Sequence, residues 1–222
     1  MDIIFLIVIL IVPALAALNV RLTFSKYKNI TSHSGFTAED AARAILDSNG
    51  LSDVSVSRVS GDMTDHYDPT SNTVYLSDTV SGSRSIAAIG VAAHECGHAI
   101  QHGESYAPVV LRSRLVPATN ICSYGSYLLV TLGFIFRMNP TLIRIGALVF
   151  LGVVIFKMIT LPVEFDASSR ALRILGGCGY LDSEELKGTK KVLTAAALTY
   201  VASLFTALLH MLRLFALSRR RR

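Results

Sequence analysis

Residues 91–100 of this chain have the sequence "VAAHECGHAI". It contains two histidines and a glutamate among small and apolar residues, where titratable groups are costly unless a partner compensates them. In a helix, His94 and His98 would point the same way, about 6 Å apart along the axis. Two nitrogens at that spacing can bind one zinc ion. Glu95 lies beside the first histidine and could accept a proton from a water that the metal activates.

Long apolar segments make up much of the rest of the chain. Of its 222 residues 51% are hydrophobic, and the mean hydropathy is +0.49. Four runs approach the length of about 20 residues needed to cross a bilayer, namely 3–20, 115–136, 142–160 and 192–212. The first run lacks a basic segment before it and begins Met1-Asp2, so we expect a retained anchor rather than a cleaved signal peptide. The three cysteines are widely spaced and predict neither a disulfide framework nor a zinc knuckle.

The net charge of +5 is concentrated at the ends of the apolar runs and at residues 219–222. In a membrane protein this pattern indicates orientation and contact with lipid headgroups. No motif for reading bases is present, so we expect no nucleic-acid partner. Most basic residues lie inside if the catalytic part is cytoplasmic, which is the predicted orientation. If residues 192–212 cross the membrane, residues 219–222 lie outside and oppose this orientation. Either that helix lies flat in the interface, or the preference for basic residues on the cytoplasmic side is overridden.

Residues 21–84 form the main soluble segment. Thr37 is a candidate N-cap for an amphipathic helix over 37–48. Residues 54–60 and 73–76 have the pattern of strands. The strand over 73–76 directly precedes the histidine helix, so its free edge could pair with an extended substrate peptide. The alternative is a plain edge strand of a small sheet.

A catalytic zinc needs three protein ligands and an open position. His102 lies about 12 Å beyond His94 along the helix, so these two and His98 cannot easily converge on one ion. In the segment "LPVEFDASSRAL", residues 161–172, we expect Pro162 to begin a helix at its first position. That helix would place Glu164 on one face with two alanines that could pack against the histidine helix. Candidates for the third ligand are His66, His102, Glu104, Glu164, Asp166 and His210.

"HECGH" followed by "VEFDAS" within hydrophobic helices resembles the YugP-type membrane zinc peptidases of bacteria, which fall among the gluzincins. The resemblance covers most of the chain. It implies that His94, His98 and Glu164 bind one zinc ion and that Glu95 is the catalytic base. It also implies a zincin-like integral membrane fold, mainly α with a small β-sheet, in the bacterial plasma membrane. The expected regions are an anchor (1–20), a catalytic part with the sheet and HExxH helix (21–114), a transmembrane hairpin (115–160), a helix with the third ligand (161–191), and a hydrophobic helix with a basic tail (192–222).

One departure concerns the residues behind the metal ligands. The heat-shock and CAAX-processing membrane peptidases have Glu-x-x-x-Asp here, and their aspartate orients a zinc-binding histidine. The fourth position after Glu164 is Ser168. Asp166 could substitute, but two positions along a helix it points elsewhere. Candidates for stabilising an oxyanion are Arg170, His66 and Tyr67, each with a packing or surface role as the alternative.

The leading hypothesis is a membrane-embedded zinc endopeptidase that cleaves membrane or membrane-adjacent polypeptides. Runs 115–136 and 142–160 are joined only by "RMNPT", so the chain returns to the side it left and the metal site should lie near the headgroups. This hypothesis implies that the protein contacts membrane lipid. It leaves open whether the protein binds other membrane proteins or forms a homo-oligomer. The alternatives are an inactive metal-stabilised scaffold or partner-binding protein, and a zinc hydrolase of a small amide or lipid. The retained Glu95 argues against the scaffold, since a structural site needs no base.

Overall fold

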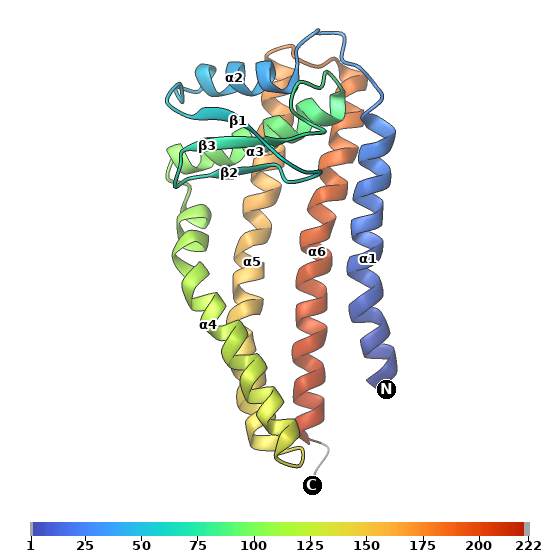
Figure 1. The fold of residues 1–222 in the computed structure, drawn as a ribbon, viewed down its shortest axis with the longest axis vertical. Coiled ribbons are helices and arrows are strands. Elements are labelled where there is room, and N and C mark those ends of the chain that lie inside the picture. The colour runs from blue at the N-terminus through green and yellow to red at the C-terminus, as the bar shows by residue number, and fades with distance from the viewer. Residues whose placement is uncertain (1, 220–222) are drawn as a thin grey trace.

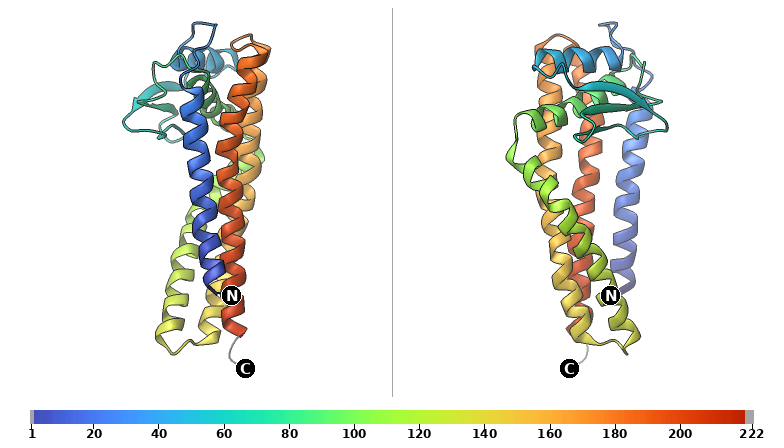
Figure 2. Two further views of the ribbon diagram at one scale, coloured as in Figure 1. Left: turned by 90° about the vertical axis from the view of Figure 1, so that its right-hand side faces the viewer. Right: turned by 60° about the vertical axis from the view of Figure 1, so that its left-hand side comes forward.

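Four long helices form a shaft, and a smaller α+β head covers one end of it (Figures 1 and 2). The computed structural model describes residues 2–219. The helices of the shaft are α1 (Asp2–Tyr27), α4 (Ala107–Ile135), α5 (Pro140–Gly177) and α6 (Ser183–Arg219). The head contains α2 (Ala38–Ser48), β1 (Ser55–Val59), β2 (His66–Asp68), β3 (Thr73–Ser77) and α3 (Ile86–Gly103). The predicted fold class, mainly α with a small sheet, is confirmed.

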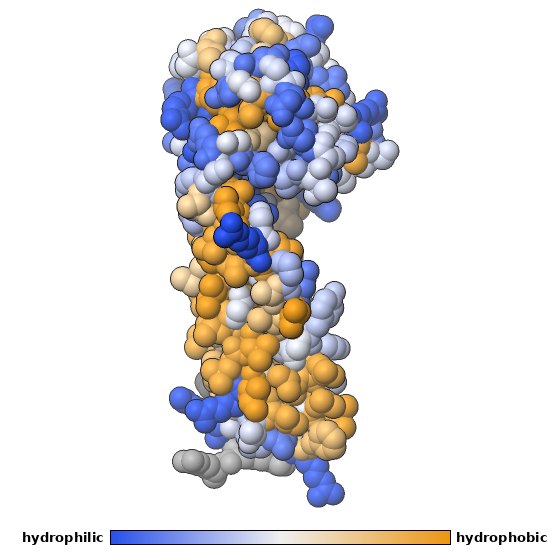
Figure 3. All heavy atoms as spheres, turned by 90° about the vertical axis from the view of Figure 1, so that its left-hand side faces the viewer, coloured by the Kyte–Doolittle hydropathy of each residue, from blue (hydrophilic) through white to orange (hydrophobic). Residues whose placement is uncertain are grey.

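The shaft has the composition of a membrane domain. All four of its helices are long and apolar enough to cross a bilayer. On the face shown in Figure 3, hydrophilic residues predominate over the head, whereas hydrophobic residues predominate over the shaft. With 38 residues, α5 is about 57 Å long, well beyond the roughly 30 Å of a hydrocarbon core. Part of α5 therefore extends out of the membrane into the head.

Helices α4 and α5 form the predicted hairpin. Asn139 ends the short turn between them, and its side chain accepts hydrogen bonds from the backbone N–H groups of Thr141 and Leu142. The two helices approach closely at Gly146, whose carbonyl accepts a hydrogen bond of 2.8 Å from Ser126 Oγ. Helix α6 runs beside α5 and α1 along the shaft (Figure 1), an arrangement that favours a spanning helix over one that lies flat in the interface.

The third-ligand segment is not a separate helix. We expected Pro162 to begin a helix, but it lies inside α5, which continues from the second arm of the hairpin to Gly177. Proline is tolerated within helices at membrane depth because neighbouring groups can satisfy the freed carbonyl. Glu164 is therefore fixed to the same rigid rod as the hairpin, and α6 begins afterwards at Ser183.

The sheet has the order β1-β3-β2, with β1 parallel and β2 antiparallel to β3. Our expectation that the strand over 73–76 has a free edge is wrong, because β3 is paired on both sides. Val74 and Leu76 of β3 are fully buried in the core of the head. Strand β2 is the outer strand on one side, and it is the strand that contacts the glutamate of the HExxH motif.

Candidate active site

The two histidines of the motif lie on α3, which Ser85 caps by accepting a hydrogen bond from the backbone N–H of Ala88. Their face of α3 packs against α5 at Gly97. A Cβ atom at Gly97 would lie only 2.7 Å from the carbonyl oxygen of Ala167. The absence of a side chain therefore allows the two backbones to approach closely. This contact brings Glu164, one turn before Ala167 on α5, to the histidine pair.

His94, His98 and Glu164 form a compact group whose possible ligand atoms lie within 4.8 Å of one another. Glu164 Oε2 is 3.5 Å from Nε2 of His94 and 3.5 Å from Nε2 of His98. This oxygen is buried, and no residue among 2–219 donates a hydrogen bond to it. A buried carboxylate oxygen without a partner is unfavourable, and a cation between the three groups would remove the penalty. Two imidazoles and one carboxylate around an open position fit a zinc ion.

Hydrogen bonds on the far side of each ring fix the orientation of the histidines. His94 Nδ1 is 3.1 Å from Ser168 Oγ, and His98 Nδ1 is 3.0 Å from Gln101 Oε1. The amide nitrogen of Gln101 donates to Val163 O at 2.9 Å. Because that nitrogen is the donor, Gln101 Oε1 must accept from His98 Nδ1–H, which leaves the Nε2 lone pair facing Glu164.

Asp166 does contribute to this arrangement, although we expected it to point elsewhere. Its Oδ2 accepts a hydrogen bond of 2.7 Å from Gln101 Nε2, so it reaches His98 through one intermediate side chain. Arg170 donates to Asp166 at 2.6 Å and to Glu104 at 2.6 Å. Its guanidinium is thus engaged behind the site, and this placement argues against the predicted oxyanion role.

Sequence reasoning did not assign Ser168 or Gln101 a role, although each had a signal. Ser168 occupies the position of the aspartate in the better-known membrane gluzincins. Gln101 lies three residues after His98, hence on the same helical face.

Glu95 lies beside the group formed by His94, His98 and Glu164 without belonging to it. It is mostly buried, and its Oε2 accepts a hydrogen bond of 3.0 Å from the backbone N–H of Tyr67 on β2. The neighbouring carboxylates also affect His98. Burial lowers the pKa of His98, but Glu164 and Glu95 outweigh this effect, and the pKa is raised above its ordinary value.

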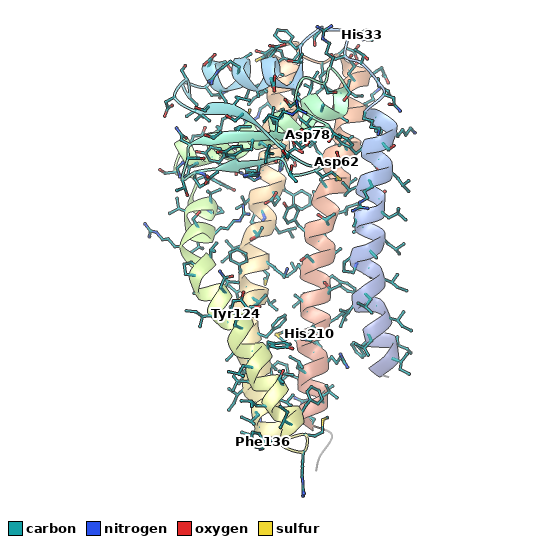
Figure 4. The ribbon with its side chains drawn as sticks, viewed as in Figure 1. His33, Asp62, Asp78, Tyr124, Phe136 and His210 are labelled. Atoms are coloured by element: carbon teal, nitrogen blue, oxygen red, sulfur yellow. The ribbon has the colours of Figure 1, made fainter. Side chains whose placement is uncertain are left out.

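The other candidates for the third ligand lie apart from the histidine pair. His66 stacks on Tyr75, with ring centroids 4.9 Å apart. His102 Nδ1 lies 3.4 Å from the hydroxyl oxygen of Tyr67. His210 is in the lower half of the shaft (Figure 4), against the ring of Phe150.

Two cavities meet at the group formed by His94, His98 and Glu164. One, of about 410 Å³, lies between α1 and α6 and has a mainly apolar lining. The other, of about 310 Å³, lies between β2, α3 and α4 and includes His66 and Arg112. His94, Glu95, Glu164 and Tyr200 line both. Sequence analysis gave no signal for Tyr200, since it lies in an apolar run of α6 like many lipid-facing aromatic residues.

A second set of possible ligands, His33, Asp182 and Glu185, lies at the start of α6. The carboxylates of this set accept hydrogen bonds from the backbone. Asp182 Oδ1 accepts from the backbone N–H groups of Glu184 and Glu185. The two oxygens of Glu185 accept from the backbone N–H groups of His33 and Asp182. This set therefore ties a loop to the beginning of α6.

Residues 2–219 match the protein family described as "Putative neutral zinc metallopeptidase". The chain is 48% identical over 198 residues to a protein of Bacillus subtilis (strain 168) named "Putative membrane protease YugP", covering 89% of this chain and 88% of the relative. No solved structure matches the chain. With an HExxH helix, a glutamate facing it, and a match along nearly its whole length, this chain belongs to that family of neutral zinc metallopeptidases.

Proposed function

We propose that this protein is a membrane-embedded zinc endopeptidase of the gluzincin type. In this proposal His94, His98 and Glu164 bind one zinc ion per chain, and Glu95 is the general base. The observation that carries the proposal is the unpartnered, buried Oε2 of Glu164, equidistant from the two Nε2 atoms, with Glu95 next to it and outside the ligand set. A purely structural metal site would have no use for such a base.

The residues divide the chemistry between them. A zinc ion bound there would activate water and polarise the scissile carbonyl. Glu95 accepts a proton from the attacking water and delivers it to the leaving amine. The N–H of Tyr67 orients the Glu95 carboxylate toward the junction of the two cavities. Ser168 and Gln101 keep the Nε2 atoms of the histidines directed at the metal position.

Tyr200 is our candidate for stabilising the oxyanion. It lines both cavities and is close enough to Glu164 and Glu95 to interact with them electrostatically. Its phenol can donate a hydrogen bond where negative charge develops on the substrate oxygen. Tyr67 is less suited, because its hydroxyl donates to Asn72 Oδ1 at 3.0 Å and its N–H is used by Glu95. His66 remains a second candidate, since it lines the cavity beside β2.

Strand β2 is the natural edge for an extended substrate. It is the outer strand next to Glu95, so a peptide added there would pass the metal position and could extend into both cavities. The apolar cavity between α1 and α6 favours a hydrophobic side chain on one side of the scissile bond.

The depth of the site favours membrane or membrane-adjacent polypeptides as substrates. Exposed large apolar side chains continue along α5 from Ile145 to Phe165, the residue after Glu164. This distance of 20 residues corresponds to about 30 Å, the thickness of a hydrocarbon core. The metal position therefore lies at the head-side boundary of the apolar belt.

We further propose that the head faces the cytoplasm of a bacterium. Among residues 2–219, ten basic residues lie near the head ends of the shaft helices, against four near the opposite end, which favours this orientation. The head-side residues are Arg21, Lys26, Lys28, Arg112, Arg114, Arg170, Arg173, Lys187, Lys190 and Lys191, and those at the opposite end are Arg137, Arg144, Arg213 and Arg219. The sequence continues with three further arginines at 220–222.

The decisive experiment uses the purified protein in detergent with a casein-type substrate, with and without a chelator. We expect hydrolysis that the chelator abolishes. Glu95→Gln should lose at least the roughly 10²–10⁴-fold typical of a general base while retaining zinc. A Glu95→Gln protein with near-full turnover and normal zinc content would refute the assigned role. Zinc binding without hydrolysis of any substrate would support an inactive metal-stabilised scaffold or partner-binding protein. Cleavage of small amides or lipids alone would support a zinc hydrolase of a different substrate class.

A further inference from the structure

A groove between α1 and α6 contains a concentration of positive charge. Its volume is about 720 Å³, and it is separate from the two cavities at the metal position. Lys26 of α1 and Lys187, Lys190 and Lys191 of α6 line it. Figure 2 shows the two helices side by side along the shaft, although about 160 residues of sequence separate these lysines. Among the described residues, no carboxylate lines the groove.

The charges in this groove are only partly compensated. Lys187 Nζ is 2.6 Å from Glu184 Oε1 at the exposed rim. Lys26 Nζ lies 5.6 Å from the centre of the Tyr27 ring, which offers a cation–π contact but no counter-charge. Within residues 2–219, neither Lys190 nor Lys191 has an ion pair. Lysines spaced three and four positions apart on one helix repel each other. The groove is therefore suited to an anion.

The surroundings indicate that the anion has an apolar tail. Leu22 and Leu198 also line the groove and are 62% and 45% exposed. They continue into the exposed apolar face of α1, which includes Leu15 and Leu18. The lysines thus lie at the head-side edge of the apolar belt, where a lipid phosphate would lie. A soluble anion would make no use of the apolar part of the groove.

We propose that this groove binds an anionic phospholipid. The phosphate lies among Lys26, Lys190 and Lys191, and the acyl chains follow the apolar faces of α1 and α6 into the bilayer. The hydroxyls of Thr23 and Thr194, which line the groove, can hydrogen-bond to the phosphate and glycerol oxygens. Basic pockets between membrane helices recognise such headgroups by this combination of charge and depth.

A lipid in this groove would join α1 to the rest of the shaft. The apolar window of α1 is only 6% buried, and its buried residues Val20, Phe24 and Tyr27 all lie near its head end. Val20 and Phe24 also line the apolar cavity beside Glu95. A lipid that bridges α1 and α6 on the outer side of their contact therefore fixes one wall of the proposed substrate cavity. This consequence rests on the proposed peptidase function, whereas lipid binding itself does not.

The test compares variants of the full-length protein in detergent by native mass spectrometry with added phosphatidylglycerol or phosphatidylcholine. Lys26→Gln combined with Lys191→Gln removes one charge from each wall. Lys28→Gln combined with Arg173→Gln is the matched control, because it removes two head-side charges outside the groove. One basic side chain at an anionic surface contributes about fivefold in affinity, so the groove variant should bind phosphatidylglycerol roughly 30-fold more weakly. The control should bind like the parent protein, and arginine at both groove positions should preserve binding.

The outcomes separate the possibilities. Equal weakening in the groove variant and the control would overturn the proposal, since the effect would be one of general surface charge. Equal affinity for the two lipids would also overturn it. Displacement of the lipid by millimolar inorganic phosphate would show a soluble-anion site instead. In bilayers, phosphatidylglycerol should raise casein hydrolysis by the parent but not by the groove variant. An inactive parent that still binds phosphatidylglycerol selectively would refute the peptidase proposal and leave the lipid site intact.

Discussion

Gly97→Ala tests whether the close approach of α3 and α5 sets the geometry of the metal site. The substitution adds one methyl group and changes no ligand. Its Cβ would lie 2.7 Å from Ala167 O, and 3.2 Å from the carbonyl carbon and Cα of the same residue. All three are backbone atoms, so no side chain can rotate away. Restoring ordinary contact at 3.4 Å requires the two helices to separate by about 0.7 Å.

This separation is large compared with what a metal site tolerates. Gly97 lies between the two histidines on α3, and Ala167 lies one turn from Glu164 on α5, so the shift is transmitted to the ligands. Ligand distances at a zinc ion must be correct to about 0.2 Å. We therefore expect zinc affinity to fall at least tenfold, and turnover to fall about 10²-fold, as for a misplacement near 1 Å at an active site.

Stability should change much less than metal binding. Alanine gains about 1 kcal/mol over glycine in helix propensity, which offsets much of an overpacking cost of about 1–3 kcal/mol. The assay is a titration of zinc against a chromophoric chelator, with helicity measured on the same samples. Gly177→Ala is the control, because it makes the same change on α5 where a Cβ meets nothing within 4 Å. A Gly97→Ala protein that binds zinc as tightly as the control would show that the close approach of α3 and α5 does not set the geometry of the ligands.

Three further predictions concern the ligands and the orientation of the chain. Glu164→Ala should lose zinc on dialysis more readily than Glu95→Gln, because it removes a ligand rather than a base; equal retention of zinc in Glu164→Ala and the parent would redirect attention to other ligands. Protons compete with zinc for His98, and Glu164 and Glu95 raise the pKa of this histidine in the metal-free protein, so the apparent zinc affinity should begin to fall at a higher pH than it would with a histidine of ordinary pKa. An apparent zinc affinity that does not change with pH around neutrality in a chelator titration would contradict this assignment. Exposed Cys178 at the head end of α5 should react with an impermeant maleimide only after the cells are permeabilised, whereas buried Cys96 should stay unlabelled; labelling of Cys178 in intact cells would place the head outside.

Features that depend on short-range periodicity could be predicted from the sequence alone. The spacing of His94 and His98 places both rings on one face of any helix. The lengths of the four apolar runs are those of membrane-crossing helices, and the short link after the second run predicted the hairpin, as found. The position of Glu164 relative to the alanines of α5 indicated which face would meet α3. These inferences required only that the segments be helical.

Which groups from distant segments meet depends on how the helices and strands pack together. Gln101 and Asp166 are 65 positions apart, and their hydrogen bond exists only because Gly97 lets the two helices approach. Tyr200 enters the site because α6 packs beside α5, and nothing in its local sequence distinguishes it from a residue that faces lipid. Strand β3 proved central and β2 outer because strand order is set by long-range pairing, which an alternating pattern does not encode. Local sequence indicates which face of each element is apolar, whereas helix packing and strand pairing choose its neighbours.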